Sequence, residues 1–365
     1  MKDVLETIGR WRSDGEPFAV ATVIKVDGSA PRDEGATMLV ARGGAIAGSV
    51  SGGCVEGAVA DEARGVLETG SPKIVRYGIN KNMMWDVGLS CGGAIDVYIQ
   101  PFDGHALPVE IARPLVLCMV VRGPSHVGAT RIVGVPATDG NGRSAGADDS
   151  SGGARSTGDP ALDAAIDAAA PAFLTRGTAK TATVGAHDVF FLPLLPDPRL
   201  IIVGAVHIAM ALCDLASRSG FAVTVVDPRE RLNNRQRFPS ARRLAVGWPE
   251  DELPALAPDE NTYVAVLTHD EKFDDPTLAY VLTRPVRYVG AIGSRKTQAL
   301  RRERLAQAGF SARAIDAVHA PVGLDIGAQT PEEIAVSILA EMIAAKYERA
   351  GMKLKDQTGE HIHAS

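Results

Sequence analysis

Residues 200–227 read LIIVGAVHIAMALCDLASRSGFAVTVVD, and this stretch decides the fold. It begins with an apolar strand, turns at Gly204, continues as a helix over 207–218 and ends in a second strand that carries Asp227. Asp227 lies 23 positions after Gly204 (227 − 204). This layout is typical of half a dinucleotide-binding Rossmann fold, in which the acid binds the ribose hydroxyls.

The glycine fingerprint of this half is incomplete. Val206 stands where a glycine would let the pyrophosphate approach the backbone, whereas Ala209 in the third position is common. Gly204 remains a candidate cofactor-binding residue, as do His207 at the helix start and Arg229, which leaves room for a 2′-phosphate. The sequence therefore predicts a Rossmann fold that binds NAD(P) weakly.

Polar residues follow two further predicted strands of this half. His269 and Asp270 follow the strand at 263–267, and a strand beginning at Arg287 runs into a basic helix through the loop of Gly293, Ser294 and Arg295. Ligands of open α/β sheets bind beyond the carboxyl ends of the strands, so these loops would face the crevice beside Gly204. The alternative for His269 and Asp270 is a helix N-cap pair.

Two cysteines in the first half each lie beside a glycine pair. Cys54 stands in GSVSGGCVE at 48–56, and Cys91 stands in GLSCGG at 88–93. Glycine pairs let a backbone approach a ligand and direct N–H groups at an anion, which makes the flanking glycines candidates: Gly52, Gly53, Gly92 and Gly93. The alternative is two glycine-rich turns that happen to contain cysteine.

Cys54 precedes a helical pattern and is expected in the first turn of that helix, where the helix dipole favours the thiolate. A thiolate attacks, carries sulfur or binds a metal. We expect Cys54 and Cys91 to act at one site although 37 residues separate them (91 − 54); the alternative is two turns on opposite edges of the domain. Cys118 and Cys213 lie in apolar segments and are expected in the core.

Composition limits the class of protein. The chain has 365 residues, is 45% hydrophobic and carries a formal net charge of −6, which is typical of a soluble acidic protein and does not indicate nucleic-acid or membrane-surface binding. No run approaches the roughly 18 apolar residues of a membrane span. Four cysteines and an N-terminus without a signal-peptide core indicate reduced thiols in the cytoplasm.

The chain is long enough for two domains. We expect a mixed α/β domain over 1–196, interrupted by a flexible Asp-, Gly- and Ser-rich loop at 138–160, and a Rossmann-like parallel-sheet domain over 197–350. Pro196 and Pro198 exclude regular structure at the boundary. Residues 351–365 are expected to form a mobile tail.

Seven segments, in order, resemble the XdhC/CoxI family, the accessory proteins of xanthine dehydrogenase and carbon monoxide dehydrogenase. They are GSAPR at 28–32, GSVSGGCVE at 48–56, LSCGG at 89–93, VVDPR at 225–229, LTHD at 267–270, YVGAIGSR at 288–295 and GLDIGA at 323–328. Cysteines in both glycine loops make the chain resemble the CoxI-type branch. Val206 departs from the family pattern, which usually has glycine before its histidine.

The resemblance implies a maturation factor that binds the molybdenum cofactor, as molybdopterin or its cytosine dinucleotide form. Such a factor protects the cofactor while its sulfido ligand is installed, and it is a chaperone rather than a catalyst. The implied partners are the large subunit of the apo-molybdoenzyme, a cysteine desulfurase and a second copy of the chain. Arg32 and Ser51 join the cofactor-binding candidates, and Cys54 or Cys91 would bind molybdenum or carry a persulfide sulfur.

Two other classes of function remain open. One is an NAD(P)-dependent oxidoreductase with a redox-active thiol, for which Asp227 would favour NAD. The other is a scaffold that only recruits partners, although a docking surface does not need glycine-flanked cysteines.

Overall fold

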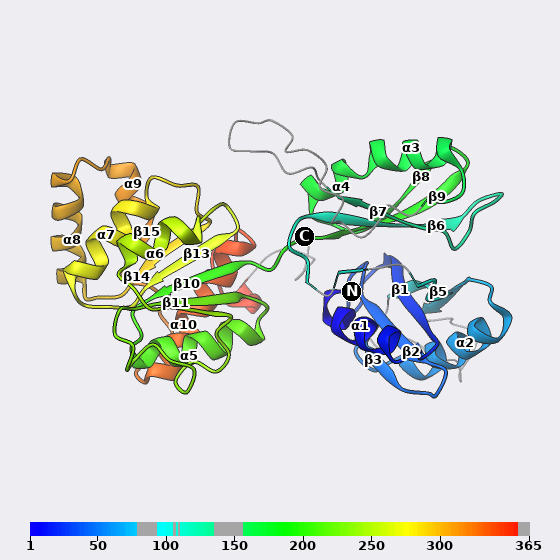
Figure 1. The fold of residues 1–365 in the computed structure, drawn as a ribbon, viewed down its shortest axis with the longest axis horizontal. Coiled ribbons are helices and arrows are strands. Elements are labelled where there is room, and N and C mark those ends of the chain that lie inside the picture. The colour runs from blue at the N-terminus through cyan, green and yellow to red at the C-terminus, as the bar shows by residue number, and fades with distance from the viewer. Residues whose placement is uncertain (79–92, 105–106, 109, 135–155, 357–365) are drawn as a thin grey trace. The chain divides into compact units, whose positions relative to one another are not determined.

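The computed structural model describes residues 1–78, 93–104, 107–108, 110–134 and 156–356. The chain divides into two compact units, unit 1 (Met1–Pro196) and unit 2, which starts at Asp197 (Figure 1). Cys91, Gly92, residues 138–155 of the expected loop and residues 357–365 of the expected tail lie outside the described residues. No helix in the described part of the chain is long and apolar enough to cross a membrane.

The first sheet of unit 1 has five antiparallel strands in the order β3-β2-β1-β5-β4. Its strands are β1 (Phe18–Asp27), β2 (Thr37–Ala41), β3 (Ile46–Gly48), β4 (Lys73–Gly78) and β5 (Ala94–Pro101). Because side chains alternate along a strand, β1 contributes to two cores. Ala19 and Val23 pack with helix α2 (Glu56–Thr69), whereas Phe18 and Val20 face the opposite side.

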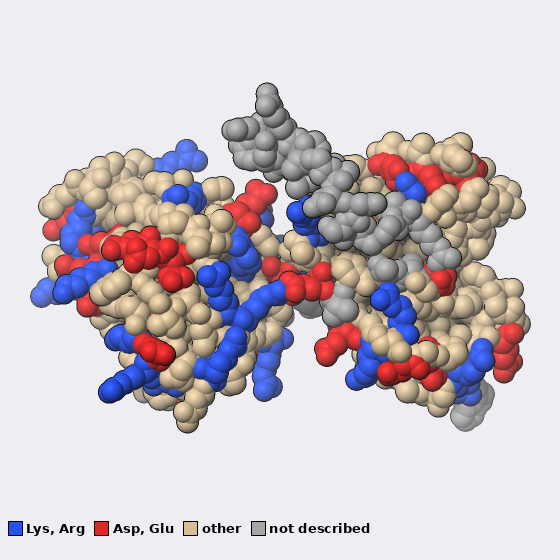
Figure 2. Space-filling model, in the orientation of Figure 1, with Lys and Arg blue, Asp and Glu red and all other residues tan. Residues whose placement is uncertain are grey.

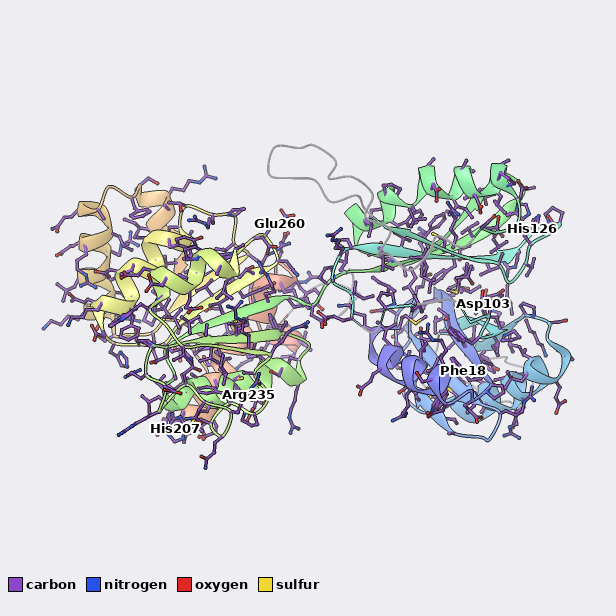
Figure 3. The ribbon with its side chains drawn as sticks, in the orientation of Figure 1. Phe18, Asp103, His126, His207, Arg235 and Glu260 are labelled. Carbon is purple, nitrogen blue, oxygen red and sulfur yellow. The ribbon has the colours of Figure 1, made fainter. Side chains whose placement is uncertain are left out.

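The second sheet of unit 1 has the order β7-β6-β9-β8. Its strands are β6 (Leu115–Arg122), β7 (Thr130–Gly134), β8 (Lys180–Val184) and β9 (His187–Leu194), and one face is covered by α3 (Pro160–Ala169) and α4 (Pro171–Arg176). The other face packs on the first sheet through a shared core that includes Phe18, Leu117 and Phe190. Phe18, labelled in Figure 3, stacks on Phe102 in this core. The ring centroids of the pair are 4.5 Å apart. Helix α1 (Leu5–Ser13), with the short η1 (Lys2–Val4), closes one end of the same core.

Unit 2 is a six-stranded parallel sheet in the order β12-β11-β10-β13-β14-β15. The strands are β10 (Arg199–Val203), β11 (Ala222–Val226), β12 (Arg243–Ala245), β13 (Thr262–Val266), β14 (Tyr288–Ala291) and β15 (Val318–His319). Numbered along the chain this order is 3-2-1-4-5-6, which is the Rossmann arrangement. The prediction of an α/β chain with a Rossmann-like second half is confirmed.

Helices cover both faces of the unit 2 sheet. One face carries α5 (His207–Arg218) and α10 (Pro331–Lys346), and the other carries α6 (Pro249–Leu256), α7 (Glu271–Val281), α8 (Arg295–Gln307) and α9 (Ala312–Asp316). The strands are buried on both sides, which explains their nearly continuous apolar sequences. Accessible polar groups that belong to the sheet itself are therefore expected in the loops at the strand ends.

A buried polar network fixes two of those loops. Arg301 of α8 binds Asp274 of α7 at 2.5 Å, and the two side chains are only 2% and 3% exposed. Asp274 also accepts a hydrogen bond from Thr268 after β13, and Arg301 donates to the carbonyl of Ile292 after β14. Burial raises the pKa of Asp274, against the opposing hydrogen bonds from Thr268 and Arg301. The ends of β13 and β14 are therefore tied together through α7 and α8.

We expect Arg301→Met to destabilise the fold by about 3–5 kcal/mol, because it leaves the buried Asp274 carboxylate without its cation. The matched control is Arg302→Met, which breaks an exposed pair with Asp316 and is expected to cost less than about 1 kcal/mol. Urea denaturation of both variants measures the difference. Equal losses would contradict the assignment of the network.

Candidate functional site

The Cys54 loop connects β3 to α2. Helix α2 begins at Glu56 with Val55 as its N-cap residue, so Cys54 precedes the helix by two positions. The prediction that Cys54 lies in the first turn is wrong, because the chain ahead of the helix wraps around the Glu56 carboxylate instead of extending the helix backwards. The Cys54 side chain is half-buried, between the exposed Gly53 and the buried Val55.

Glu56 is the organising residue of this loop, and it is not among the residues predicted from the sequence. Its carboxylate accepts hydrogen bonds from two hydroxyls, those of Ser49 and Ser51, both at 2.6 Å. It also accepts from four backbone amides, those of Val50 (3.2 Å), Ser51 (2.9 Å), Gly53 (2.9 Å) and Val55 (3.2 Å). Burial raises the pKa of Glu56, but these donors outweigh it and lower the pKa to about 2.

The glycine amides of this loop are used inside it. The Gly53 amide donates to Glu56, and the Gly52 amide donates to the Ser49 hydroxyl at 2.8 Å. The sequence predicts a bound anion at these amides, and the anion that the Gly53 amide holds here is the chain's own carboxylate. The backbone conformation requires glycine, since φ is +78° at Gly52 and +117° at Gly53. A Cβ at Gly53 would meet nothing within 4 Å, so the backbone beside Cys54 is open to approach.

Two of the segments singled out in the sequence, together with Gly93 of a third, come together in unit 1. A Cβ at Gly93 would lie 2.2 Å from the Ser29 carbonyl oxygen, so the two backbones are in close contact. Pro31, in the same loop as Ser29, lies 3.8 Å from the position of a Cβ on Gly52. Segments 28–32 and 48–56 and Gly93 therefore come together, and Gly93 is two residues from Cys91 in the chain.

Arg32 extends from the same loop. Its guanidinium binds the Asp3 carboxylate at 3.1 Å, and the two side chains are 37% and 41% exposed. An exposed ion pair of this kind contributes little to stability, so Arg32 can exchange Asp3 for another anion at little cost. No group of three or more His, Cys, Asp or Glu side chains in the described residues is arranged to hold a metal.

The candidates in unit 2 follow the carboxyl ends of the strands. Gly204 after β10 has φ +106°, and a Cβ there would lie 2.4 Å from the Thr268 methyl group, so this glycine permits two strand ends to pack. His207 is the first residue of α5 and is exposed (Figure 3). Val206 is the N-cap residue of α5.

Asp227 is buried and is bound by protein donors. It accepts hydrogen bonds from the Ala205 amide at 2.7 Å and from the Arg229 amide, Nε and Nη2 at 2.9, 2.9 and 2.6 Å. Burial raises its pKa, but the donors of Arg229 and Ala205 outweigh this and the pKa is lowered. The sequence predicts that Asp227 binds a ribose and Arg229 a phosphate, whereas in the structure they bind each other.

Two of the remaining candidates, Asp270 and Ser294, are N-cap residues of helices. Asp270 is the N-cap residue of α7 and accepts from the Lys272 amide at 3.0 Å, which is the alternative that the sequence left open for it. His269 beside it is exposed. Ser294 caps α8, after Gly293 with φ +139° and before the exposed Arg295. Basic and acidic side chains are interleaved over the visible face of unit 2 (Figure 2).

We expect the Glu56 carboxylate to give unit 1 a pH-dependent stability. The pKa of Glu56 is about 2 in the folded protein against an ordinary 4.5, so its contribution is complete above pH 4.5 and is lost as the pH falls towards 2. Glu56→Gln should therefore cost about 1–2 kcal/mol at pH 7 and progressively less below pH 4.5. Urea denaturation of the wild-type protein and the variant across this pH range measures the difference in the free energy of unfolding. The control is Glu62→Gln, which lies on the same helix as Glu56 and removes an exposed ion pair with Lys73 of β4. An equal pH-dependent loss of stability in this variant would contradict the prediction.

We expect Cys54 to be alkylated faster than Cys118 and Cys213. Burial raises the pKa of Cys118 well above its ordinary value and raises that of Cys213 to about 11, and both side chains are buried. Mass spectrometry of iodoacetamide-treated protein at pH 7–8 gives the rate at each site. Faster reaction at Cys118 or Cys213 would show that the Cys54 loop does not present a reactive thiol.

Comparison with known proteins relates both units to one family. The family model described as XdhC Rossmann domain matches residues 200–342, and the model described as XdhC and CoxI family matches residues 11–78. The chain is 28% identical over 347 residues to a probable xanthine dehydrogenase subunit of Bacillus subtilis, covering 91% of this chain and 94% of that protein. It is 26% identical over 332 residues to the molybdenum cofactor insertion chaperone PaoD of Escherichia coli, covering 91% and 84%.

A solved structure extends the similarity to the whole fold. The crystal structure described as a xanthine dehydrogenase from Bacillus halodurans superposes with a TM-score of 0.71 at 27% identity, covering 98% of each chain. The two family models fall in different units, one in each, and their order along the chain agrees with the order of the seven segments. The chain belongs to the XdhC and CoxI family.

Proposed function

We propose that this chain is an accessory protein that binds the molybdenum cofactor and supports its sulfuration and its insertion into a molybdoenzyme of the xanthine dehydrogenase or carbon monoxide dehydrogenase type. The similarity to an insertion chaperone supports this, as does family membership. The cysteines in both glycine loops favour the CoxI-type branch. The units Met1–Pro196 and Asp197 onward then act as cofactor-binding and Rossmann-like domains.

The observation that carries the proposal is the Cys54 thiol held on a rigid loop. The loop closes around Glu56 through six hydrogen bonds, so the position of the Cys54 backbone is fixed before any ligand arrives. Pre-organisation of this kind lowers the entropy cost of binding. The half-buried thiol has an open glycine on one side, which suits either a soft metal ligand or a carrier of sulfur.

The surrounding residues suit an anionic cofactor. Arg32, in the loop that contacts Gly52, offers a guanidinium whose present ion pair is exposed and easily exchanged. When bound, the cofactor supplies the molybdenum and its sulfur chemistry. This chain's part is to hold the anion at Arg32, to present the Cys54 thiol beside it and to keep the backbone at Gly53 accessible.

The oxidoreductase alternative gains no support from unit 2. Its essential acid, Asp227, accepts four hydrogen bonds from protein donors, and Val206 occupies the position where a pyrophosphate requires glycine. The partners we propose are therefore those of a maturation factor: the large subunit of the apo-molybdoenzyme, a cysteine desulfurase and a second copy of the chain.

We expect protein purified from molybdate-supplied cells to contain molybdenum and to release a fluorescent oxidised pterin on denaturation. Cys54→Ala should lower the molybdenum content at least fivefold, because it removes the soft ligand or sulfur carrier. Cys213→Ala is the matched control, since it removes a buried thiol of unit 2 and should retain the metal. Metal and pterin absent from the wild-type protein would refute the proposed function.

The same measurement tests whether Cys54 and Cys91 share a site. If both thiols contact one cofactor, replacing Cys54 and Cys91 together should lower the binding free energy by less than the sum of the two single losses. Losses at independent distant sites add within ~0.5 kcal/mol. Strictly additive losses would assign the two cysteines to separate sites.

A further inference from the structure

We infer that the carboxyl edge of unit 2 carries a binding shelf for a planar nitrogen heterocycle, formed by Arg229 and Trp248, which both pack against Phe273. This deepens the proposed function, and rests on it only for the identity of the ring, which would be the pterin or the cytosine of the cofactor. The stacking chemistry itself is independent of it.

Phe273 packs with each of the other two side chains. The Arg229 guanidinium carbon lies 5.6 Å from the centroid of the Phe273 ring, and the Trp248 ring lies 4.9 Å from the same centroid at an interplanar angle of 39°. Phe273 is 6% exposed, whereas Trp248 is 41% exposed and the Arg229 side chain is 48% exposed. A buried ring thus supports two planar groups that remain open to solvent.

The shelf lies where the fold places ligands. Arg229 follows β11, Trp248 follows β12, and Phe273 lies in the first turn of α7, after β13. All three follow the carboxyl ends of parallel strands, at the edge where open α/β sheets bind their ligands. The shelf therefore has contributions from both sides of β10, where the strand order reverses.

Arg229 is fixed before a ligand binds. Its Nε and Nη2 donate to the two oxygens of Asp227, at 2.9 and 2.6 Å, and the Asp227 carboxylate is itself fully buried. The bidentate pair sets the plane of the guanidinium, and a guanidinium plane stacks on heterocyclic rings. The rotamer entropy that an exposed arginine would lose on binding is already lost.

Trp248 remains 41% exposed although its ring packs against Phe273. It is the N-cap residue of α6, but its side chain makes no capping hydrogen bond. Val246, two residues earlier, is also exposed, at 48%. Two exposed large apolar side chains on one loop at the carboxyl edge of the sheet suit a ligand surface. Aromatic and cationic faces together suit an electron-rich planar ring.

The geometry also indicates that the shelf does not recognise a ribose. In a dinucleotide-binding Rossmann fold the acid after the second strand binds the ribose hydroxyls. Here Asp227 is occupied by Arg229 and the Ala205 amide, so affinity should come from the ring and not from the ribose. This separates the shelf from an NAD site.

Calorimetry on the full chain tests the inference with four probes: CMP, 2′,3′-dideoxy-CMP, AMP and pterin-6-carboxylate. We expect CMP or the pterin to bind, and the dideoxy nucleotide to bind as well as CMP. Trp248→Ala should weaken binding about five- to 150-fold, as loss of one stacking partner does. Trp248→Phe should retain most of the affinity. Tyr347→Ala, which removes another exposed aromatic ring of unit 2, is the control and should leave affinity unchanged.

Unchanged affinity in Trp248→Ala, or no binding of any probe to the wild-type protein at about 1 mM, would overturn the inference. A strong dependence on the ribose hydroxyls would also overturn it, because it would return Asp227 to ribose binding. The result is separable from the proposed function. Molybdenum retained without probe binding would refute only the shelf, and probe binding at Trp248 in a protein that never contains molybdenum would refute only the maturation role.

Discussion

A carboxylate withdrawn from water must be paired, and in this protein four such carboxylates hold the loops that the sequence makes conspicuous. Asp227 and Asp274 are buried, whereas Glu56 and Glu341 are half-buried. Glu56 closes the loop around Cys54, and Asp227 ties the turn after β10 to the loop after β11. Asp274 joins the ends of β13 and β14 through Thr268 and Arg301. Glu341 of α10 accepts from the Tyr288 hydroxyl and the Gly323 amide, and binds His319 at 3.2 Å. Removing any one of them would leave several donors unsatisfied, at about 1–3 kcal/mol for each one that is buried.

This use of carboxylates changes how the glycine loops act. Amides that could have held a ligand anion at Gly53 and Ala205 already hold an anion of the protein. The glycines are needed for positive φ or for close approach, as at Gly204 against Thr268 and Gly93 against Ser29. What the loops offer to a ligand is therefore a side chain on a fixed backbone: a thiol in unit 1, and an indole and a guanidinium in unit 2.

Much of the fold could be predicted from the sequence because it depends on local patterns. Apolar runs, a glycine turn and an acid at a fixed spacing identify β10, α5 and β11, and a short apolar run with flanking polar residues identifies β13. The spatial order of the strands follows from the Rossmann rule rather than from any residue. Helices α3 and α4 were not predicted, since an alanine-rich segment beside a polar stretch has little apolar period.

The site is less predictable because its decisive contacts are hydrogen bonds between donors and acceptors of the chain itself. Glu56 was visible as a helix-start acid, but nothing in its spacing shows that Ser49 and Ser51 turn back towards it. Asp227 has the expected position, but Arg229, two residues later, donates to its carboxylate in place of a ribose. A pattern records which residue types are present, whereas function depends on which side chains a ligand can reach once the chain has used its own donors and acceptors. The side chains that remain accessible in this way include Cys54, Arg32, Trp248 and Arg229. All four are half-buried or exposed, and each lies outside the helices and strands, in a loop.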